Sequence, residues 1–148
     1  MSRIQREIRV GIVGANAKSS WAKVSHVPAI NGLPGLKLAA VATRKEQSAR
    51  EAAEAFGADR WFSDPFAMIR DEQIDVVTIA VKVPAHRELV LAALNAGAAV
   101  YCEALNGRWC KRAGSQIVEA KGVTPSTFHN GSGRRFLITH AAQDRQEK

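Results

Sequence analysis

The stretch IRVGIVGANAKSSWAK, residues 8–23, decides the fold, because a buried strand runs directly into a glycine turn there. The six residues IRVGIV form a short run rich in β-branched side chains, which is typical of a buried strand. Gly14 follows at once, but Asn16 stands where a glycine-rich phosphate turn usually has its second glycine. Ser19 or Ser20 takes the place of the third glycine. We therefore predict a strand, a phosphate-type turn and a helix, in this order.

Strands and helices are predicted to alternate up to residue 103. Five strands are expected at 8–13, 36–43, 61–62, 75–81 and 98–102, and four helices at 21–30, 46–56, 64–70 and 84–95. The apolar residues of the first helix recur at helical spacing, and they are Trp21, Val24, Val27 and Ile30. Pro28 is expected to kink or restart this helix. Because no hairpin turn separates the strands, the predicted fold is α/β, a doubly wound parallel (Rossmann) sheet covered by helices on both faces.

The composition is that of a protein with one folded domain. A chain of 148 residues, 46% hydrophobic and 24% charged, can bury a sizeable core in water. The longest apolar runs are too short to span a membrane, and the first residues lack the apolar core of a signal peptide. We therefore expect a cytoplasmic protein with no membrane partner. Cys102 and Cys110 are expected to be reduced thiols rather than a disulfide or a zinc site, so no metal site is predicted.

The net charge of +7 raises the question of a nucleic-acid partner. Residues 1–107 hold 13 Lys and Arg against 11 Asp and Glu, whereas residues 108–148 hold 8 against 3. The excess charge is therefore concentrated in the last part of the chain, and the body is nearly neutral. A nucleic-acid-binding domain would show basic residues clustered on a recognition element, and the sequence has no such motif. We predict no nucleic-acid partner.

The glycine turn is a candidate ligand site. In a doubly wound sheet the ligand lies beyond the carboxyl ends of the strands, next to the loop after the first strand. Backbone N–H groups hold phosphates there, so a close approach of the backbone matters more than any side chain. Gly14 would form the tight turn, and Asn16 is expected to replace the second glycine by tolerating a left-handed backbone. Ser19 and Ser20 could cap the helix and contact a phosphate. The alternative is a strand-to-helix loop that binds nothing.

The residues at the end of the second predicted strand, Ala42-Thr43-Arg44-Lys45, bear on the choice of nucleotide. A protein that prefers NAD usually has an acidic residue here, which accepts hydrogen bonds from the ribose hydroxyls. The guanidinium of Arg44 and the ammonium of Lys45 would instead pair with the 2′-phosphate of NADP. The predicted cofactor is NADP, with NAD as the alternative. A second interpretation is that Arg44 and Lys45 only form a solvated helix start.

Several phrases, taken together and in order, resemble one protein family. They are IRVGIVG at 8–14, HVPAI at 26–30, LAAVATR at 38–44, AAEAFGA at 52–58, IDVVTIAVKVPAH at 74–86 and ALNAGAAVYCE at 93–103. In this order and spacing they resemble the amino-terminal NAD(P)-binding domain of the Gfo/Idh/MocA oxidoreductases. The loop NAKSSWA at 16–22, followed by HVPAI, is most similar to a branch that includes the fungal galactose-pathway repressor, a regulator that binds NAD(P).

The resemblance implies a set of cofactor-binding residues. The pyrophosphate and adenosine side would be lined by Gly14, Asn16, Ala17, Ser19, Ser20 and Trp21, with Thr43 and Arg44 at the adenosine ribose. Val81 and Val83 would flank the nicotinamide-side ribose. His86 would lie near the cofactor or, equally, would cap or pack its helix. Glu103 matches the glutamate of the family's Glu-Lys-Pro motif. A sugar-like or polyol substrate is also implied, and a homo-oligomer is compatible with the resemblance.

The chain departs from the family directly after Glu103. Ala104 and Leu105 stand where the family enzymes usually have a catalytic lysine and a proline. A methyl group cannot donate or polarise as lysine does, so no catalytic residue is predicted in this chain. Residues 104–148 are expected to be a tail of uncertain fold, although 116–123 and 131–135 resemble the family's next helix, strand and loop. We expect 1–103 to form the Rossmann core and the family's second, substrate-binding α/β domain to be absent.

Two hypotheses about function follow from the resemblance. The first is the nucleotide-binding half of an NAD(P)-dependent oxidoreductase that acts on a sugar or polyol, in a truncated or frame-disturbed chain that is inactive alone. The second is a non-enzymatic NAD(P)-sensing regulatory module, like the galactose repressor. A third and plainer interpretation is an incomplete gene product that is held together by partners or prone to aggregate, because loss of a second domain would expose apolar surface.

Overall fold

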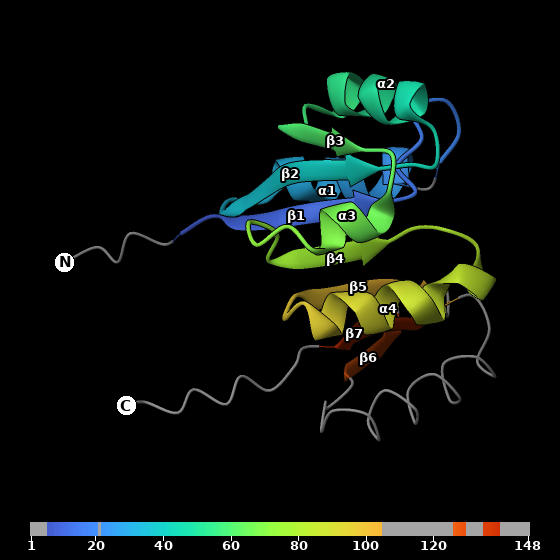
Figure 1. Cartoon of the computed structure of the whole chain (residues 1–148). Helices are drawn as coiled ribbons and strands as arrows, with labels where there is room; N and C mark the ends of the chain where they lie inside the picture. The colour runs from blue at the N-terminus through green and yellow to red at the C-terminus, as the bar shows by residue number, and fades with distance from the viewer. Residues whose placement is uncertain (1–5, 21, 105–125, 130–134, 140–148) are drawn as a thin grey trace.

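The computed structural model describes residues 6–20, 22–104, 126–129 and 135–139, which form one β-sheet between two layers of helices (Figure 1). The strands are β1 (Ile8–Val13), β2 (Leu36–Ala42), β3 (Arg60–Phe62), β4 (Val76–Ile79), β5 (Ala99–Ala104), β6 (Ser126–His129) and β7 (Arg135–Thr139). The helices are the π-helix η1 (Ala22–His26), α1 (Val27–Gly32), α2 (Glu46–Phe56), α3 (Pro65–Ile69), the 3₁₀-helix η2 (Val83–Ala85) and α4 (His86–Asn95).

The first five strands are parallel and have the order β3-β2-β1-β4-β5. The chain therefore starts in the middle of the sheet, builds outward through β2 and β3, and then returns to the other side of β1 with β4. This reversal next to β1 is the topological switch point of a doubly wound sheet, beside which such folds bind their ligands. The predicted α/β Rossmann-like fold is confirmed.

Two further strands extend the sheet in a way that the sequence analysis did not anticipate. β7 pairs antiparallel with β5, and β6 pairs antiparallel with β7, so the complete order of the described strands is β3-β2-β1-β4-β5-β7-β6. The helix and strand expected at 116–123 lie outside the described residues, as does most of the phrase at 131–135. An edge strand takes its place from the partner that it pairs with, and no local sequence pattern reveals that partner.

The core lies on both faces of the sheet, because side chains of the strands alternate between the two helical layers. Ile12 is fully buried and packs with residues of α1 and α2, whereas its neighbour Val13 packs with residues of α3 and α4. Gly11 lies on the side of α3, where a Cβ would be 3.0 Å from the Cε of Met68. The absence of a side chain at Gly11 therefore lets α3 pack closely on β1.

The helical segment after β1 differs from the prediction in which side chains it buries. Val24 is 64% exposed, although the spacing of apolar residues predicts it on the buried face. The reason is that residues 22–26 form a π-helix, whose wider turn buries Ala22 and His26 instead. The predicted restart at proline is confirmed, since α1 begins at Val27 with Pro28 in its first turn.

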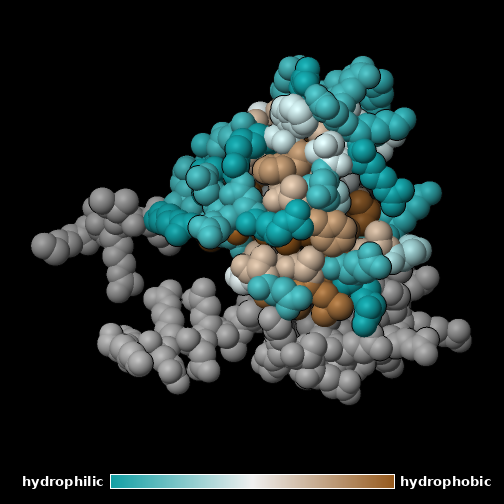
Figure 2. All heavy atoms as spheres, viewed as in Figure 1, coloured by the Kyte–Doolittle hydropathy of each residue, from teal (hydrophilic) through white to brown (hydrophobic). Residues whose placement is uncertain are grey.

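Helix α2 agrees with the prediction from the sequence, in which apolar spacing and a following glycine define its bounds. Its bounds are those predicted, and its buried residues are Ala49, Ala52, Ala53 and Phe56. Gly57 ends it with a left-handed backbone, at φ 73°, and its N–H donates to the carbonyl of Ala53. Figure 2 shows hydrophilic residues over the outer side of α2 at the top of the view and apolar residues gathered in the middle of this face.

Two expectations from composition concern cysteine and membranes. Cys102 is a buried thiol that is not in a disulfide, and Cys110 lies outside the described residues. Of the helices in the described part of the chain, none combines the length and the hydropathy that a membrane crossing requires.

The N-cap of α3 gives a prediction about stability. A carboxylate oxygen of Asp64 accepts a hydrogen bond of 2.9 Å from the backbone N–H of Phe66, and Pro65 occupies the first turn, as the sequence indicates. Asp64→Ala is expected to lower the free energy of unfolding by about 1 kcal/mol, measured by urea denaturation. Asp64→Asn is the control, because it keeps an acceptor oxygen. An equal loss in both variants would assign the effect to the Arg70 ion pair at 3.7 Å instead.

Candidate nucleotide-binding site

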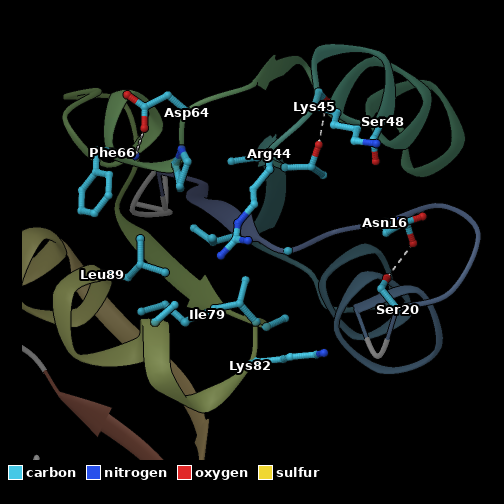
Figure 3. Close-up of a pocket in the computed structure, with 18 of the residues that line it drawn as sticks. Asn16, Ser20, Arg44, Lys45, Ser48, Asp64, Phe66, Ile79, Lys82 and Leu89 are labelled. Carbon is cyan, nitrogen blue, oxygen red and sulfur yellow. Dashed lines mark hydrogen bonds between the residues drawn. The ribbon is translucent and has the colours of Figure 1, made fainter.

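A cavity of about 1400 Å³ opens at the carboxyl ends of β1, β2 and β4, beside the switch point. The three strands contribute Val13, Ala42 and Ile79 to its lining. Figure 3 shows two distinct ends of the cavity: the apolar side chains of Phe66, Ile79 and Leu89 lie at one end, and the polar Asn16 and Ser20 lie at the other. The cavity can therefore hold a ligand that has both an apolar group and a strongly polar group.

Gly14 occupies the point where the three strands meet. Its φ is 90°, its N–H donates to the carbonyl of Ala42 on β2, and a Cβ on it would lie 2.6 Å from the carbonyl oxygen of Ala80. The same Cβ would be 2.8 Å from Cγ1 of Val81. Both the backbone conformation and the space therefore require glycine here. The prediction that Gly14 forms the tight turn is confirmed by its φ.

Asn16 stabilises the loop through its side chain, and not through the left-handed backbone that was predicted. No residue other than glycine has a positive φ in the described part of the chain, so the expected left-handed backbone at Asn16 is wrong. Its side-chain Oδ1 instead accepts a 2.8 Å hydrogen bond from the backbone N–H of Lys18. Its carbonyl accepts a 2.7 Å hydrogen bond from the hydroxyl of Ser20 (Figure 3). An Asx turn at Asn16 thus fixes the conformation of the loop at the position where the second glycine usually stands.

The loop also leaves backbone donors available. Within the described residues, the N–H groups of Ala17, Ser19 and Ser20 donate to no protein acceptor. Ser19 is exposed, and Ser19 and Ser20 both line the cavity. The hydroxyl of Ser20 also accepts a 3.3 Å hydrogen bond from the N–H of Lys23, so it caps the first turn of the helical segment. Unpaired N–H groups beside a cavity form a suitable environment for an anion.

The loop after β2 carries the cationic side of the cavity. Thr43 is half-buried, and its hydroxyl donates to the carbonyl of Lys45 at 2.9 Å. Arg44 is exposed and has no ion-pair partner among the residues that the structure describes. Figure 3 shows its guanidinium directed from this loop into the cavity. Lys45 and Ser48, at the start of α2, also line the cavity.

The acidic residues of the cavity lining are Glu51, Asp64 and Glu88. None of them lies at the carboxyl end of β2. Glu51 accepts a hydrogen bond from the side chain of Gln47 and lies 4.0 Å from the Nζ of Lys18, and Asp64 caps α3. The region next to Arg44 therefore carries excess positive charge.

The loop after β4 completes the cavity. Val81 packs against Gly14 and lines the cavity, as does Lys82, which reaches toward the space from this loop in Figure 3. Lys82 is not among the cofactor-binding residues predicted from the sequence. Its position one residue beyond Val81 was a usable signal, because every residue that follows a central strand of a doubly wound sheet lies near the ligand edge. η2 begins at Val83, whose side chain is outside the described part.

Four further residues predicted to bind the cofactor do not line the cavity or are not fully described. His86 is 1% exposed and does not line the cavity, since its ring is bonded inside the core. Ala17 is half-buried beside the loop. Trp21 lies outside the described residues, and Glu103 is described only through the backbone of β5. The structure thus brings Gly14, Asn16, Ser19, Ser20, Thr43, Arg44 and Val81 to one cavity.

Comparisons with known proteins identify the family of this chain. Residues 8–104 match the oxidoreductase family with an NAD-binding Rossmann fold, GFO_IDH_MocA. A D-apiose dehydrogenase of Paraburkholderia graminis is 37% identical over 79 residues, which cover 53% of this chain and 21% of that protein. An inositol 2-dehydrogenase of Saccharopolyspora erythraea is 35% identical over 98 residues, which cover 65% of this chain and 27% of that protein.

Two solved structures have a fold similar to that of this chain. A levoglucosan dehydrogenase in complex with NADH superposes with a TM-score of 0.65 at 27% identity, over 74% of this chain and 32% of the other. A biliverdin reductase from Synechocystis, in complex with biliverdin and NADP⁺, gives a TM-score of 0.61 at 30% identity, over 78% of this chain and 35% of the other. This chain spans about a third or less of the length of each of these four relatives. It belongs to the Gfo/Idh/MocA oxidoreductase family, and residues 8–104 are its NAD-binding Rossmann-fold domain.

Proposed function

We propose that this chain binds a nicotinamide dinucleotide in the cavity at the ends of β1, β2 and β4, with NADP preferred to NAD, as part of an oxidoreductase for a sugar or polyol. The observation that carries the proposal is the combination of Gly14, at which any Cβ would meet the backbone, with unpaired N–H groups in the next six residues. A pyrophosphate needs this combination of close backbone approach and free donors.

The preference for NADP rests on the charges at the end of β2. A 2′-phosphate is a dianionic group with strong acceptor oxygens, and a guanidinium binds it by charge-assisted hydrogen bonds. Arg44 is unpaired among the described residues and is directed into the cavity, with Lys45 and Ser48 beside it. No carboxylate is present at this position to bind the ribose hydroxyls of NAD. If Arg44 and Lys45 were only a solvated helix start, the two nucleotides would bind equally.

The oxidoreductase part of the proposal comes from the relatives. They include dehydrogenases for D-apiose, inositol and levoglucosan, which are sugars, polyols or an anhydrosugar. The dinucleotide, when bound, supplies the hydride chemistry, and the protein binds and orients it. The loop at Gly14 would hold the pyrophosphate, Arg44 the adenosine ribose, and Val81 the other side of the nucleotide. The substrate would be bound largely by residues outside this domain.

A direct titration tests the proposal. Isothermal titration calorimetry of the full chain with NADP⁺ and with NAD⁺ is expected to give saturable binding of both, at least about 10-fold tighter for NADP⁺, which corresponds to 1.4 kcal/mol. AMP is the control ligand, because it lacks both the pyrophosphate and the 2′-phosphate. Absence of binding by either dinucleotide would contradict the proposal, and equal affinities would contradict the part that concerns NADP.

A second candidate function is a nucleotide-sensing module without catalysis, in the manner of the galactose-repressor branch. The observation that favours it is Ala104 at the last position of β5, where the resemblance places the catalytic lysine of the family enzymes. NADPH fluorescence tests the sensing module. Formation of NADPH on addition of NADP⁺ with inositols or aldoses would contradict it and favour the enzyme, whereas both candidates predict no NADPH from this chain if the substrate is bound outside this domain.

A further inference from the structure

We infer that His86 is a positioning residue for the cofactor cavity, and that it acts together with Cys102 by holding the loop between β4 and α4 in place. The inference rests on the proposed nucleotide-binding function. It concerns a set of three groups that we call the His86 latch: the carbonyl of Val81, the imidazole of His86 and the thiol of Cys102. In the proposed complex, the nucleotide contacts none of the atoms that form the latch, which are the carbonyl oxygen of Val81, the ring nitrogens of His86 and the sulfur of Cys102.

The latch joins three separate elements through both ring nitrogens. His86 is the first residue of α4, Cys102 is on β5, and Val81 is in the loop after β4. The Nε2 atom of His86 lies 2.5 Å from the carbonyl oxygen of Val81, and its Nδ1 atom lies 2.9 Å from Sγ of Cys102. The two bonded residues are 5 and 16 positions from His86 along the chain.

The chemistry of the partners assigns the hydrogens. A carbonyl oxygen only accepts, so Nε2 carries a hydrogen and donates to Val81. Nδ1 of the neutral ring then accepts, and the thiol of Cys102 donates to it. In the neutral ring, the hydrogen bond to the carbonyl therefore selects the Nε2–H tautomer.

The burial of His86 and Cys102 makes the loss of a hydrogen bond in the latch costly. His86 is 1% exposed and Cys102 is fully buried, so water cannot replace a missing partner. A buried polar group that loses its partner retains the whole cost of its desolvation. Removal of the thiol would therefore take away the hydrogen bond between Cys102 and Nδ1 of His86 in a place where water does not replace it, and the ring would be freer to move away from Val81.

The loop that the latch holds is one wall of the cavity. Cγ1 of Val81 is within 2.8 Å of the position that a Cβ of Gly14 would take, so Val81 lies directly against the glycine turn. Ala80, Val81, Lys82, Pro84 and Ala85 all line the cavity, although His86 itself does not. His86 thus affects the cavity only through Val81 and its neighbours, and a displacement of the ring would displace this wall.

Paired substitutions test the latch. Cys102→Ala removes the donor, whereas Cys102→Ser keeps a donor in a side chain of nearly the same shape. We expect Cys102→Ala to weaken NADP⁺ binding about 5- to 10-fold, as expected for one buried hydrogen bond, and Cys102→Ser to stay within about 2-fold of the wild type. His86→Leu is expected to weaken NADP⁺ binding at least as much as Cys102→Ala does. His86→Gln, whose amide can donate to the Val81 carbonyl, is expected to bind NADP⁺ more tightly than His86→Leu.

Val100→Ala is the matched control for stability. Val100 is 1% exposed on the same strand as Cys102, so its truncation destabilises β5 without touching the latch. We expect its NADP⁺ affinity to stay within about 2-fold of the wild type, although its melting temperature falls. A spectroscopic readout is also available, since long-range ¹H–¹⁵N NMR correlations should report the Nε2–H tautomer for His86 in the wild type.

The outcomes separate this inference from the proposed function. If the wild type binds NADP⁺ and Cys102→Ala binds it equally well, the inference is overturned and the proposed function stands. Equal weakening by Cys102→Ala and Val100→Ala would overturn it too, because the effect would be one of general stability, and so would an Nδ1–H tautomer. Failure of the wild type to bind either dinucleotide overturns the proposed function, and the role of the latch in cofactor binding with it.

Discussion

Gly14→Ala is expected to weaken NADP⁺ binding by at least about 100-fold, because the added methyl group would displace the turn that binds the pyrophosphate. The added methyl would lie 2.6 Å from the carbonyl oxygen of Ala80, and the φ of 90° is one that alanine rarely adopts. The turn must therefore move away from β4, and the N–H groups after it move with it. Two charge-assisted hydrogen bonds to a phosphate each contribute about 1.5–3 kcal/mol. Their loss would therefore cost more binding free energy than the 2.7 kcal/mol that corresponds to a 100-fold change in the dissociation constant, at about 1.4 kcal/mol for each factor of ten.

The same substitution is expected to destabilise the fold. The backbone conformation costs about 1–2 kcal/mol for a residue with a Cβ, and overpacking against Ala80 and Val81 adds about 1–3 kcal/mol. Calorimetric titration measures the first effect, and urea denaturation measures the second.

Gly35→Ala is the matched control for Gly14→Ala. Gly35 has a similar φ of 83°, but nothing lies within 4 Å of the position of its Cβ. It should therefore lose only the conformational part of the stability, about 1–2 kcal/mol, and should bind NADP⁺ like the wild type. If Gly14→Ala bound NADP⁺ as tightly as Gly35→Ala does, the dinucleotide would not lie against this turn.

Arg44→Ala is expected to raise the dissociation constant of NADP⁺ about 10- to 100-fold and to change that of NAD⁺ less than about 2-fold. The guanidinium reaches into the cavity and has no competing carboxylate in the described part of the chain, so its charge is available to a 2′-phosphate. A hydrogen bond to a charged group contributes about 1.5–3 kcal/mol, which sets the range. NAD has a hydroxyl at this position and gains little from the cation.

Two further variants separate a local contact from net charge. Arg6→Ala also removes one positive charge, but Arg6 pairs with Asp75 at the opposite end of β4 from the cavity. It should leave the ratio of the two affinities unchanged. Arg44→Asp places a carboxylate where NAD-preferring proteins have one, and it should reverse the preference. A fall in NADP⁺ affinity of the same size in Arg6→Ala and Arg44→Ala would show long-range attraction rather than contact with the 2′-phosphate.

The sequence by itself determined the alternation of five parallel strands with helices and the place of the glycine turn. The bounds of β1 and α2 agree with the prediction residue for residue, because short-range periodicity and glycine stops are local properties. The tight turn at Gly14 was also predictable, because a buried strand that runs into a helix in a doubly wound sheet is followed by a sharp turn at the ligand edge. Arg44 and Lys45 follow from the same reasoning, because the end of β2 lies at the ligand edge of any doubly wound sheet.

Only the tertiary structure decided how the residues of the loops are used. Asn16 bonds Lys18 with its side chain rather than adopting a left-handed backbone, His86 is bonded between Val81 and Cys102 rather than facing the cavity, and Lys82 lines the cavity. β6 and β7 likewise join the sheet through β5. These outcomes depend on partners distant along the chain or on one side-chain torsion. Periodicity reports which face of an element is buried, but not which of several polar partners a loop side chain meets once the elements have packed.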